Sequence, residues 1–321
     1  MSIKWWSVMS IAVVSMVCAS SAMSQAWPNK PVRIIVTSAA GSGPDTLTRY
    51  IGVRLSRSIG QSVVVENRPG ANGVIGTQAG ARAAPDGYTF VLATSSSFSV
   101  NRYTVKALPY DPIKDFVPVV LLATGGLVVI ANPNAPIKTL ADLVAFDKRE
   151  PGKLSVATEG PVAGTILAYL NEFLGTKLVQ IPHTNAALAV QDVMTGRTEL
   201  SVASVILSLP FIKSGAVRAI AVTTSKRDPS LPDVPTIGET SPGFGVNAWT
   251  MLVAPAGTPT DIVRQVNVEV NRILKDPEVP QWMMQFGNRA EGGTVEGAAD
   301  FVRTDAVLWE KITRAAGIKP E

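Results

Sequence analysis

The chain is 321 residues long, with 29 lysine and arginine residues against 25 aspartate and glutamate residues, and it contains one histidine and one cysteine. The resulting net charge of +4 is modest and no block of basic residues stands out, which argues against a nucleic-acid-binding protein. The length is enough for two domains or one large one, with a core that needs no disulfides.

The first 26 residues have the pattern of a cleaved secretory signal peptide. Lys4 precedes the mostly apolar stretch WWSVMSIAVVSMVCA, and the small residues that follow end in SQA at 24–26. A short basic region, an apolar core and an A-x-A-like site are typical of signal peptides. The apolar part is too short for a comfortable transmembrane helix, although a retained membrane anchor stays open as the alternative. Cys18 leaves with the signal, so we expect a periplasmic mature chain without thiol chemistry.

Strand-like and helix-like segments alternate along the rest of the chain. Short β-rich runs between helical segments predict parallel sheets covered by helices on both faces. In the first part we expect strands at 32–36, 62–66 and 88–94, with helices at 44–58 and 74–84. Next come apolar strands within 119–133, strands at 153–158, 178–183, 199–204 and 217–224, helices at 140–150, 160–174 and 187–196, and a segment at 207–214. The tail adds the irregular proline-rich segment 228–239, the apolar run NAWTMLVAP, and helices at 259–275 and 295–316.

Loops of small residues follow the strands in both halves. Ligands of open α/β sheets bind beyond the carboxyl ends of the strands, so two facing sheets would surround one cleft with these loops. The loops at 37–45, 70–73, 94–97 and 158–165 offer hydroxyls and backbone N–H groups at helix starts, which hold carboxylates without a buried cation. Asp45 stays open between a first-turn acid that favours the helix dipole and a contact to ligand or water.

A dinucleotide-binding enzyme is the first rival interpretation. Gly41-Ser42-Gly43 follows a strand and opens a helix, and Glu66 ends the second strand at the distance expected of a ribose-binding acid. The third glycine of the fingerprint is Thr46, however, which removes the close approach of helix to strand. Export adds to this objection, because free nicotinamide cofactors are scarce outside the cytoplasm.

A hydrolase or a metalloenzyme is the second rival. His183 is the only histidine, so any catalytic triad must use it, and no G-x-S-x-G elbow occurs. One histidine, no cysteine after residue 18 and no H-E-x-x-H motif also argue against a metal site. We therefore expect no catalysis, no metal and no cofactor.

Longer motifs point to one family. They are WPNKPVRIIV (27–36), TSAAGSGPD (37–45), LPYDPIKDFVPVVLLA (108–123), RAIAVTTSKRDPSLPDVPTIGE (218–239), LVAPAGTP (252–259) and the ending AAGIKPE. The most specific block is GQSVVVENRPGANGVIGTQAGARAAPDGYTFVLATSS, at 60–96. Across the mature chain these motifs resemble the Bug/TctC family of periplasmic solute-binding proteins, the receptors of tripartite tricarboxylate transporters.

The resemblance implies a fold, a function and a partner. The fold is α/β, a two-lobed periplasmic binding protein of type II, or Venus flytrap, in which each lobe is a mainly parallel sheet flanked by helices. Domain 1 would comprise 27–125 plus 225–321, and domain 2 would comprise 126–224. The implied function is monomeric capture of a small organic carboxylate, either a dicarboxylate or an aromatic one, for membrane permease subunits. A carboxylate sensor with a signalling partner and an exported enzyme remain the alternatives.

By position, the resemblance also implies a set of ligand contacts made through backbone amides and hydroxyls. The first domain would supply Gly41, Ser42, Gly43, Asp45, Asn72, Gly73, Thr94, Ser95 and Ser96. The second would supply Thr158, Gly160, Gly164, Thr165, His183, Thr184, Ala203 and Ser204.

The chain departs from the family pattern at several of these loops. Thr37-Ser38 replaces a proline–phenylalanine pair, Ser42 replaces a glycine, and Glu159 enters a loop that is usually rich in glycine, asparagine and serine. Ala203 replaces an aspartate, which argues mildly against an amino-acid ligand. His183 stands in a changed segment, and it either contacts the ligand or serves the structure of a strand end.

Overall fold

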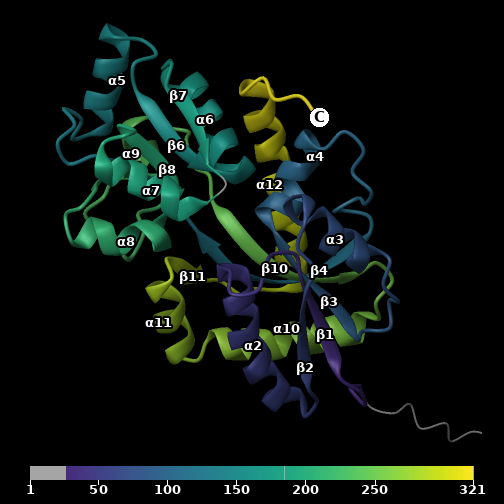
Figure 1. Cartoon of the computed structure of the whole chain (residues 1–321). Coiled ribbons are helices and arrows are strands. Elements are labelled where there is room, and N and C mark those ends of the chain that lie inside the picture. The colour runs from purple at the N-terminus through teal and green to yellow at the C-terminus, as the bar shows by residue number, and fades with distance from the viewer. Residues whose placement is uncertain (1–26, 184, 321) are drawn as a thin grey trace, which may run out of the picture.

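The computed structural model describes residues 27–183 and 185–320, which form two lobes joined side by side (Figure 1). The predicted signal peptide and the candidate site residue Thr184 lie outside the described residues. Over the described part of the chain, none of the helices combines the length and the apolar character needed to cross a membrane.

The first lobe is built on a six-stranded sheet in the order β11-β4-β10-β3-β1-β2. Its strands are β1 (Val32–Val36), β2 (Val63–Asn67), β3 (Thr89–Thr94), β4 (Phe116–Gly125), β10 (Ala248–Pro255) and β11 (Asn288–Ala290). The helices of this part of the chain are α2 (Gly43–Ile59), η2 (Ala71–Gly73), α3 (Val74–Ala81), η3 (Ser96–Val100), α4 (Asn101–Thr104), α10 (Thr260–Leu274), α11 (Glu278–Gln285) and α12 (Val295–Ala315).

The second lobe is built on a five-stranded sheet in the order β7-β6-β8-β5-β9. Its strands are β5 (Leu127–Ala131), β6 (Ser155–Glu159), β7 (Val179–His183), β8 (Leu200–Ser204) and β9 (Arg218–Val222). Its helices are α5 (Leu140–Arg149), α6 (Gly160–Leu174), α7 (Ala186–Thr195), α8 (Val205–Lys213) and α9 (Ile237–Thr240).

Both sheets are mixed rather than mainly parallel, which corrects that part of the expectation. β1 is parallel to β2 and β3, and β6 is parallel to β7 and β8. β10 and β5, however, are each antiparallel to both of their neighbours, and β11 is antiparallel to β4. β5 and β10 follow the points where the chain crosses between sheets, so they begin at the lobe boundary and run away from it. The βαβ crossovers make the remaining neighbours parallel.

Local sequence signals account for the helix ends. α2 begins after Ser42 with Pro44 in its first turn and ends at Gly60, whose φ of 70° suits glycine, so the predicted helix at 44–58 is confirmed. α5 begins at a capping box in which Thr139 and Asp142 bond each other's backbone. The sequence interpretation missed η2, η3, α4, α9, α11 and β11, all of which are short.

The helix α12 packs against both lobes. It contacts β4 and α10 in the first lobe and α6 in the second (Figure 1). Trp309 and Ile312, near its C-terminal end, are fully buried in the apolar core of the second lobe. Phe244 and Val246, which precede β10, join the same core. The second lobe is therefore completed by residues that follow its sheet in the chain.

Asp305 ties three elements of the fold together. Its carboxylate on α12 is 8% exposed and accepts hydrogen bonds from Trp249 Nε1 of β10, at 2.8 Å, and from the hydroxyl of Ser99 in η3. Burial raises the pKa of this carboxyl. We expect Asp305→Ala to lower the free energy of unfolding by about 2–4 kcal/mol, because two buried donors lose their acceptor. Urea unfolding at several pH values measures it.

Asp305→Asn keeps an acceptor oxygen, so it should lower the free energy of unfolding much less than Asp305→Ala does. Because the pKa of Asp305 is raised in the folded state, its contribution to stability is fully present below the unfolded-state pKa and is lost as the pH rises through the folded-state pKa. The asparagine variant should lack this pH dependence. Asp300→Ala, on the exposed face of α12, is the matched control, and an equal effect of the two alanine variants would contradict the role of Asp305.

Candidate ligand cleft

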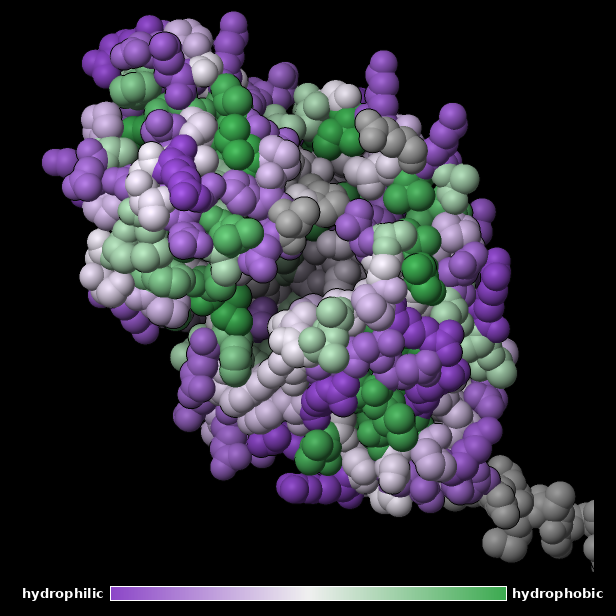
Figure 2. Space-filling model, viewed as in Figure 1, coloured by the Kyte–Doolittle hydropathy of each residue, from purple (hydrophilic) through white to green (hydrophobic). Residues whose placement is uncertain are grey.

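The carboxyl ends of the parallel strands line a cleft between the lobes. β1, β2 and β3 end at this edge of the first sheet, and β6, β7 and β8 end at the matching edge of the second sheet. A helix begins shortly after each of these strands, and η3 contacts α6 across the boundary. Figure 2 shows the surface hollowed between the two lobes. The topology thus brings the predicted loops of both halves to one place.

The loops of the first lobe pack into a single surface. Gly73 has a φ of 90°, and a Cβ there would lie 3.3 Å from Thr37 Cβ and 3.4 Å from Ser97 Cβ. Asn101 Nδ2 donates to the carbonyl of Asn72 at 3.1 Å. The three loops after β1, β2 and β3 are therefore in direct contact, and glycine at 73 permits their close approach.

Asp45 organises the first of these loops. Its side chain is 3% exposed and accepts from Gly41 N at 2.8 Å and from Asn67 Nδ2 at 2.8 Å, and Arg49 Nε lies 3.0 Å from its Oδ1. Asn67 Nδ2 also reaches the carbonyl of Ser38, at 3.2 Å. Burial alone would raise the pKa of Asp45, but these hydrogen bonds, that of Arg49 first, hold it below its usual value. The buried Asp45 thus fixes the conformation of the loop at 37–45 through hydrogen bonds. Asn67 is a partner that the sequence interpretation missed.

The cleft side of the first lobe offers backbone and hydroxyl groups. Gly41, Gly43 and Asn72 are exposed, whereas Ser42, Thr94 and Ser96 are half-buried and Ser95 is buried. Ser42 Oγ lies 2.8 Å from Ser38 Oγ, and Thr94 is bonded to Ser97. The hydroxyls of Ser95 and Ser96 have no partner within the described residues. They are the free hydrogen-bonding groups of this loop.

Uncapped helix starts lie on the cleft side of the second lobe. α6 begins at the exposed Gly160, which has a φ of 65°, and no side chain caps its first turn. α8 begins after the half-buried Ser204, again without a side-chain cap, but the N–H of Val205 donates to the carbonyl of Gly126 at 3.2 Å. Free N–H groups at the start of α6, together with the helix dipole, favour an anion.

Three candidate residues of the second lobe, Thr158, Thr165 and Ala203, lie beneath this surface, and Gly164 is half-buried. Thr158 is fully buried, and its hydroxyl accepts from Gln180 Nε2 at 2.9 Å. A Cβ on Gly164 would meet the same Gln180 side chain. Thr165 is 4% exposed, as is Ala203, whose methyl group packs in the apolar core. These side chains support the strand ends and helix starts.

His183 is bound to its own lobe. Its Nδ1 lies 3.0 Å from the carbonyl of Ile181, and its Nε2 lies 2.9 Å from Asp192 Oδ2 in α7. The hydrogen bond from His183 is the main cause of a lowered pKa of Asp192. Both ring nitrogens face acceptors, so this arrangement favours the structural interpretation of His183. It also leaves the only histidine unavailable as a base for a serine nucleophile.

Glu159 places a carboxylate at the lobe boundary. It ends β6 directly before Gly160, and within the described residues it has neither a hydrogen bond nor an ion pair. Its side chain is solvent-accessible, yet the surrounding protein displaces enough water to raise its pKa. Across the described chain, no group of three or more histidine, cysteine, aspartate or glutamate side chains could hold a metal ion.

Known proteins share this sequence and architecture. Residues 47–318 match the family described as "Tripartite tricarboxylate transporter family receptor". Protein BugT of Bordetella pertussis is 30% identical over 316 residues, which cover 97% of each chain. The solved structure of R. palustris Rpa4515 with adipate has 31% identity and a TM-score of 0.81, covering 92% of this chain and 100% of that one. The structure of MatC from Rhodopseudomonas palustris with bound malate has 30% identity and a TM-score of 0.75, covering 89% and 99%.

The match spans most of the chain, and the two-lobed α/β fold agrees with the solved relatives. The resemblance seen in the motifs is therefore confirmed. The chain belongs to the Bug/TctC family of tripartite tricarboxylate transporter receptors.

Proposed function

We propose that this protein is a periplasmic receptor that captures a small organic carboxylate between its lobes and delivers it to the permease of a tripartite tricarboxylate transporter. The observation that carries the proposal is a set of groups at the facing edges of the two sheets. They are the uncapped starts of α3 and α6 and the unpartnered hydroxyls, those of Ser95 and Ser96 among them. Such groups bind carboxylates. Two relatives whose structures hold adipate and malate support this ligand class.

The mechanism follows from the position of the groups. A carboxylate held by the α6 start on one side and by the 94–97 loop on the other would contact both lobes. Such a ligand has a higher affinity for the closed arrangement than for the open one, so binding shifts the population toward closure. The closed surface is then what the permease recognises.

The packing supports a revised division into domains. In our proposal domain 1 comprises 27–125 and the chain from β10 onward, and domain 2 extends from 126 to about Val246, because Phe244 and Val246 join the core of the second sheet. α12 belongs to both. The predicted boundary at 224 would cut this core.

Isothermal calorimetry against a panel of dicarboxylates, hydroxy acids, amino acids and aromatic acids tests the proposal. We expect at least one acid to bind, and a Ser96→Ala variant to weaken it; Ser214→Ala, at the far end of α8, is the matched control. No binding by any acid at millimolar concentration would overturn the proposal. Uptake that persists after deletion of the permease genes would favour the sensor alternative.

Glu159 is expected to select among carboxylates. Its negative charge at the cleft disfavours a dianion and favours a ligand that presents an ammonium or hydroxyl donor. We expect Glu159→Gln to tighten the binding of dicarboxylates severalfold and to weaken the binding of amino acids. Competition calorimetry with one acid of each kind measures this. Equal shifts for both kinds would show that Glu159 does not face the ligand.

A further inference from the structure

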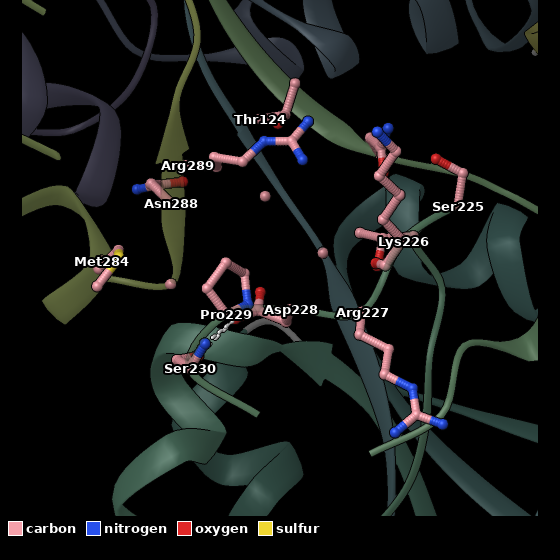
Figure 3. Close-up of a pocket in the computed structure, with 15 residues that line it drawn as sticks. Thr124, Ser225, Lys226, Arg227, Asp228, Pro229, Ser230, Met284, Asn288 and Arg289 are labelled. Carbon is pink, nitrogen blue, oxygen red and sulfur yellow. Dashed lines mark hydrogen bonds between the residues drawn. The ribbon is translucent and has the colours of Figure 1, made fainter. Parts of the chain in front are cut away.

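A second hollow lies at the junction of the lobes, next to the start of α8. It is an open pocket lined by Thr124–Gly126, 224–230, Asn247, Met284 and 287–289 (Figure 3). The first of these segments links β4 to β5, and Asn247 directly precedes β10, so both strand crossings between the lobes contribute. None of the predicted ligand residues lines this pocket.

Three basic side chains and one carboxylate line the pocket, and two carboxylates beside it, Glu239 and Glu291, pair with two of the cations. Arg227 is bound to Glu239 through three hydrogen bonds and points away from the pocket (Figure 3). Asp228, the only carboxylate in the lining, is 8% exposed, and its Oδ1 accepts from the backbone and the hydroxyl of Ser230. Lys226, which has no ion pair within the described residues, and Arg289, which is paired with Glu291, are thus the cations that face the pocket.

Arg289 is held in place from behind. Its Nε and its Nη2 both lie 2.8 Å from Glu291 Oε1, and the hydroxyl of Thr124 donates to the same oxygen, which leaves Nη1 of Arg289 without a partner among the described residues. Figure 3 shows its guanidinium group turned into the pocket, toward the side on which Lys226 lies. A guanidinium fixed in this way loses little entropy when it binds an oxyanion.

Several other polar groups of the pocket, which are exposed or half-buried, are free to bind a ligand. The Lys226 ammonium, the Asn247 and Asn288 amides and the Ser225 hydroxyl have no hydrogen-bond partner within the described residues. All of them can donate, and an oxyanion offers several acceptors to such donors.

We propose that this pocket binds a small inorganic oxyanion, phosphate or sulfate, that bridges Lys226 and Arg289. Lys226 belongs to the loop after β9 of the second sheet, whereas Arg289 lies in β11 of the first sheet. An anion that contacts both side chains stabilises the lobe arrangement in which they face each other. Its binding therefore restricts movement about the junction.

This restriction couples the pocket to the cleft by linkage: if the anion changes carboxylate affinity, the carboxylate changes anion affinity by the same factor. The coupling rests on the proposed function, but the binding of the anion does not. An experiment can therefore contradict the proposed function, and the coupling with it, without contradicting the binding of the anion.

Calorimetry of the mature protein with inorganic phosphate, sulfate or acetate, at constant ionic strength set with sodium chloride, tests the site. We expect phosphate and sulfate to bind, and Lys226→Met or Arg289→Met to weaken binding by about tenfold or more, since each removes a charge-assisted hydrogen bond. Lys153→Met, an exposed lysine in a turn of the second lobe, is the matched control and should bind phosphate like the wild type.

A spin-label pair, one label on each lobe, supplies the second readout. Phosphate should narrow the distribution of inter-lobe distances in the wild type and not in Lys226→Met. No phosphate binding above the chloride background, or equal binding by the Lys226 variant and the wild type, would overturn the proposal. Tighter binding of acetate than of phosphate at this site would overturn the assignment to inorganic oxyanions. Phosphate binding in a protein that binds no organic acid would leave this site standing and remove the proposed function alone.

Discussion

Replacing Asp45 by alanine is expected to lower the free energy of unfolding by about 3 kcal/mol and to remove carboxylate binding. The carboxylate is 3% exposed and gathers Gly41 N, Arg49 and Asn67 around it. Without it, buried donors lose their acceptor, and the loop at 37–45 loses the bonds that fix its glycines at the cleft. Stability and affinity should therefore fall together.

The pH dependence of the free energy of unfolding distinguishes the contribution of the Asp45 charge from that of its hydrogen bonds. The pKa of Asp45 is lowered in the folded state, so its contribution is present above the unfolded-state pKa and is lost as the pH falls through the folded-state pKa. This sign is opposite to that of Asp305. Asp45→Asn should remove the acid dependence while keeping part of the loop.

Urea unfolding and calorimetry with the best acid of the panel measure both effects. Asp233→Ala, an exposed carboxylate in the proline-rich segment, serves as the control and should change neither quantity. An Asp45→Ala protein that binds the acid with wild-type affinity would show that the loop does not hold the ligand.

Long, regular segments of this fold could be predicted from the sequence. α2, α6, α10 and α12 lie within two residues of their expected ends, because capping residues and apolar periodicity act locally. The proline-rich segment 228–239 is irregular as expected up to Thr236, after which α9 begins, and it buries Leu231 and Ile237 against the second lobe. No local pattern marks those two residues as core, since the partners that cover them are distant in the chain.

The roles of individual cleft residues were harder to predict. The contact between Asp45 and Asn67 spans 22 positions, and the contact between His183 and Asp192 depends on the face of β7 that meets α7. The resemblance places a residue in a loop, but whether its side chain faces the ligand or the protein depends on such tertiary contacts. Thr158 and Ala203 show this, because both lie at strand ends beside the cleft and both are buried.

Gly287→Ala is expected to weaken carboxylate binding by about tenfold or more, through the lobe junction rather than the cleft. Gly287 precedes β11 with a φ of 60°, and a Cβ there would lie 2.8 Å from Ile206 N and 3.1 Å from Ile206 Cα. Ile206 lies in the first turn of α8, so the added methyl group would press on backbone of the other lobe. Backbone cannot rotate away as a side chain can, and the lobes must separate to make room.

Gly60→Ala separates this contact from backbone strain. Gly60 has a similar φ of 70°, but a Cβ there would meet nothing within 4 Å. Both variants should lose about 1 kcal/mol of stability to the left-handed conformation. Only Gly287→Ala should also weaken ligand binding and widen the inter-lobe distance seen by spin labels or small-angle scattering. If the two variants bind the ligand equally well, the contact between Gly287 and α8 does not limit closure, and the coupling between junction and cleft must pass through α12 or the two strand crossings.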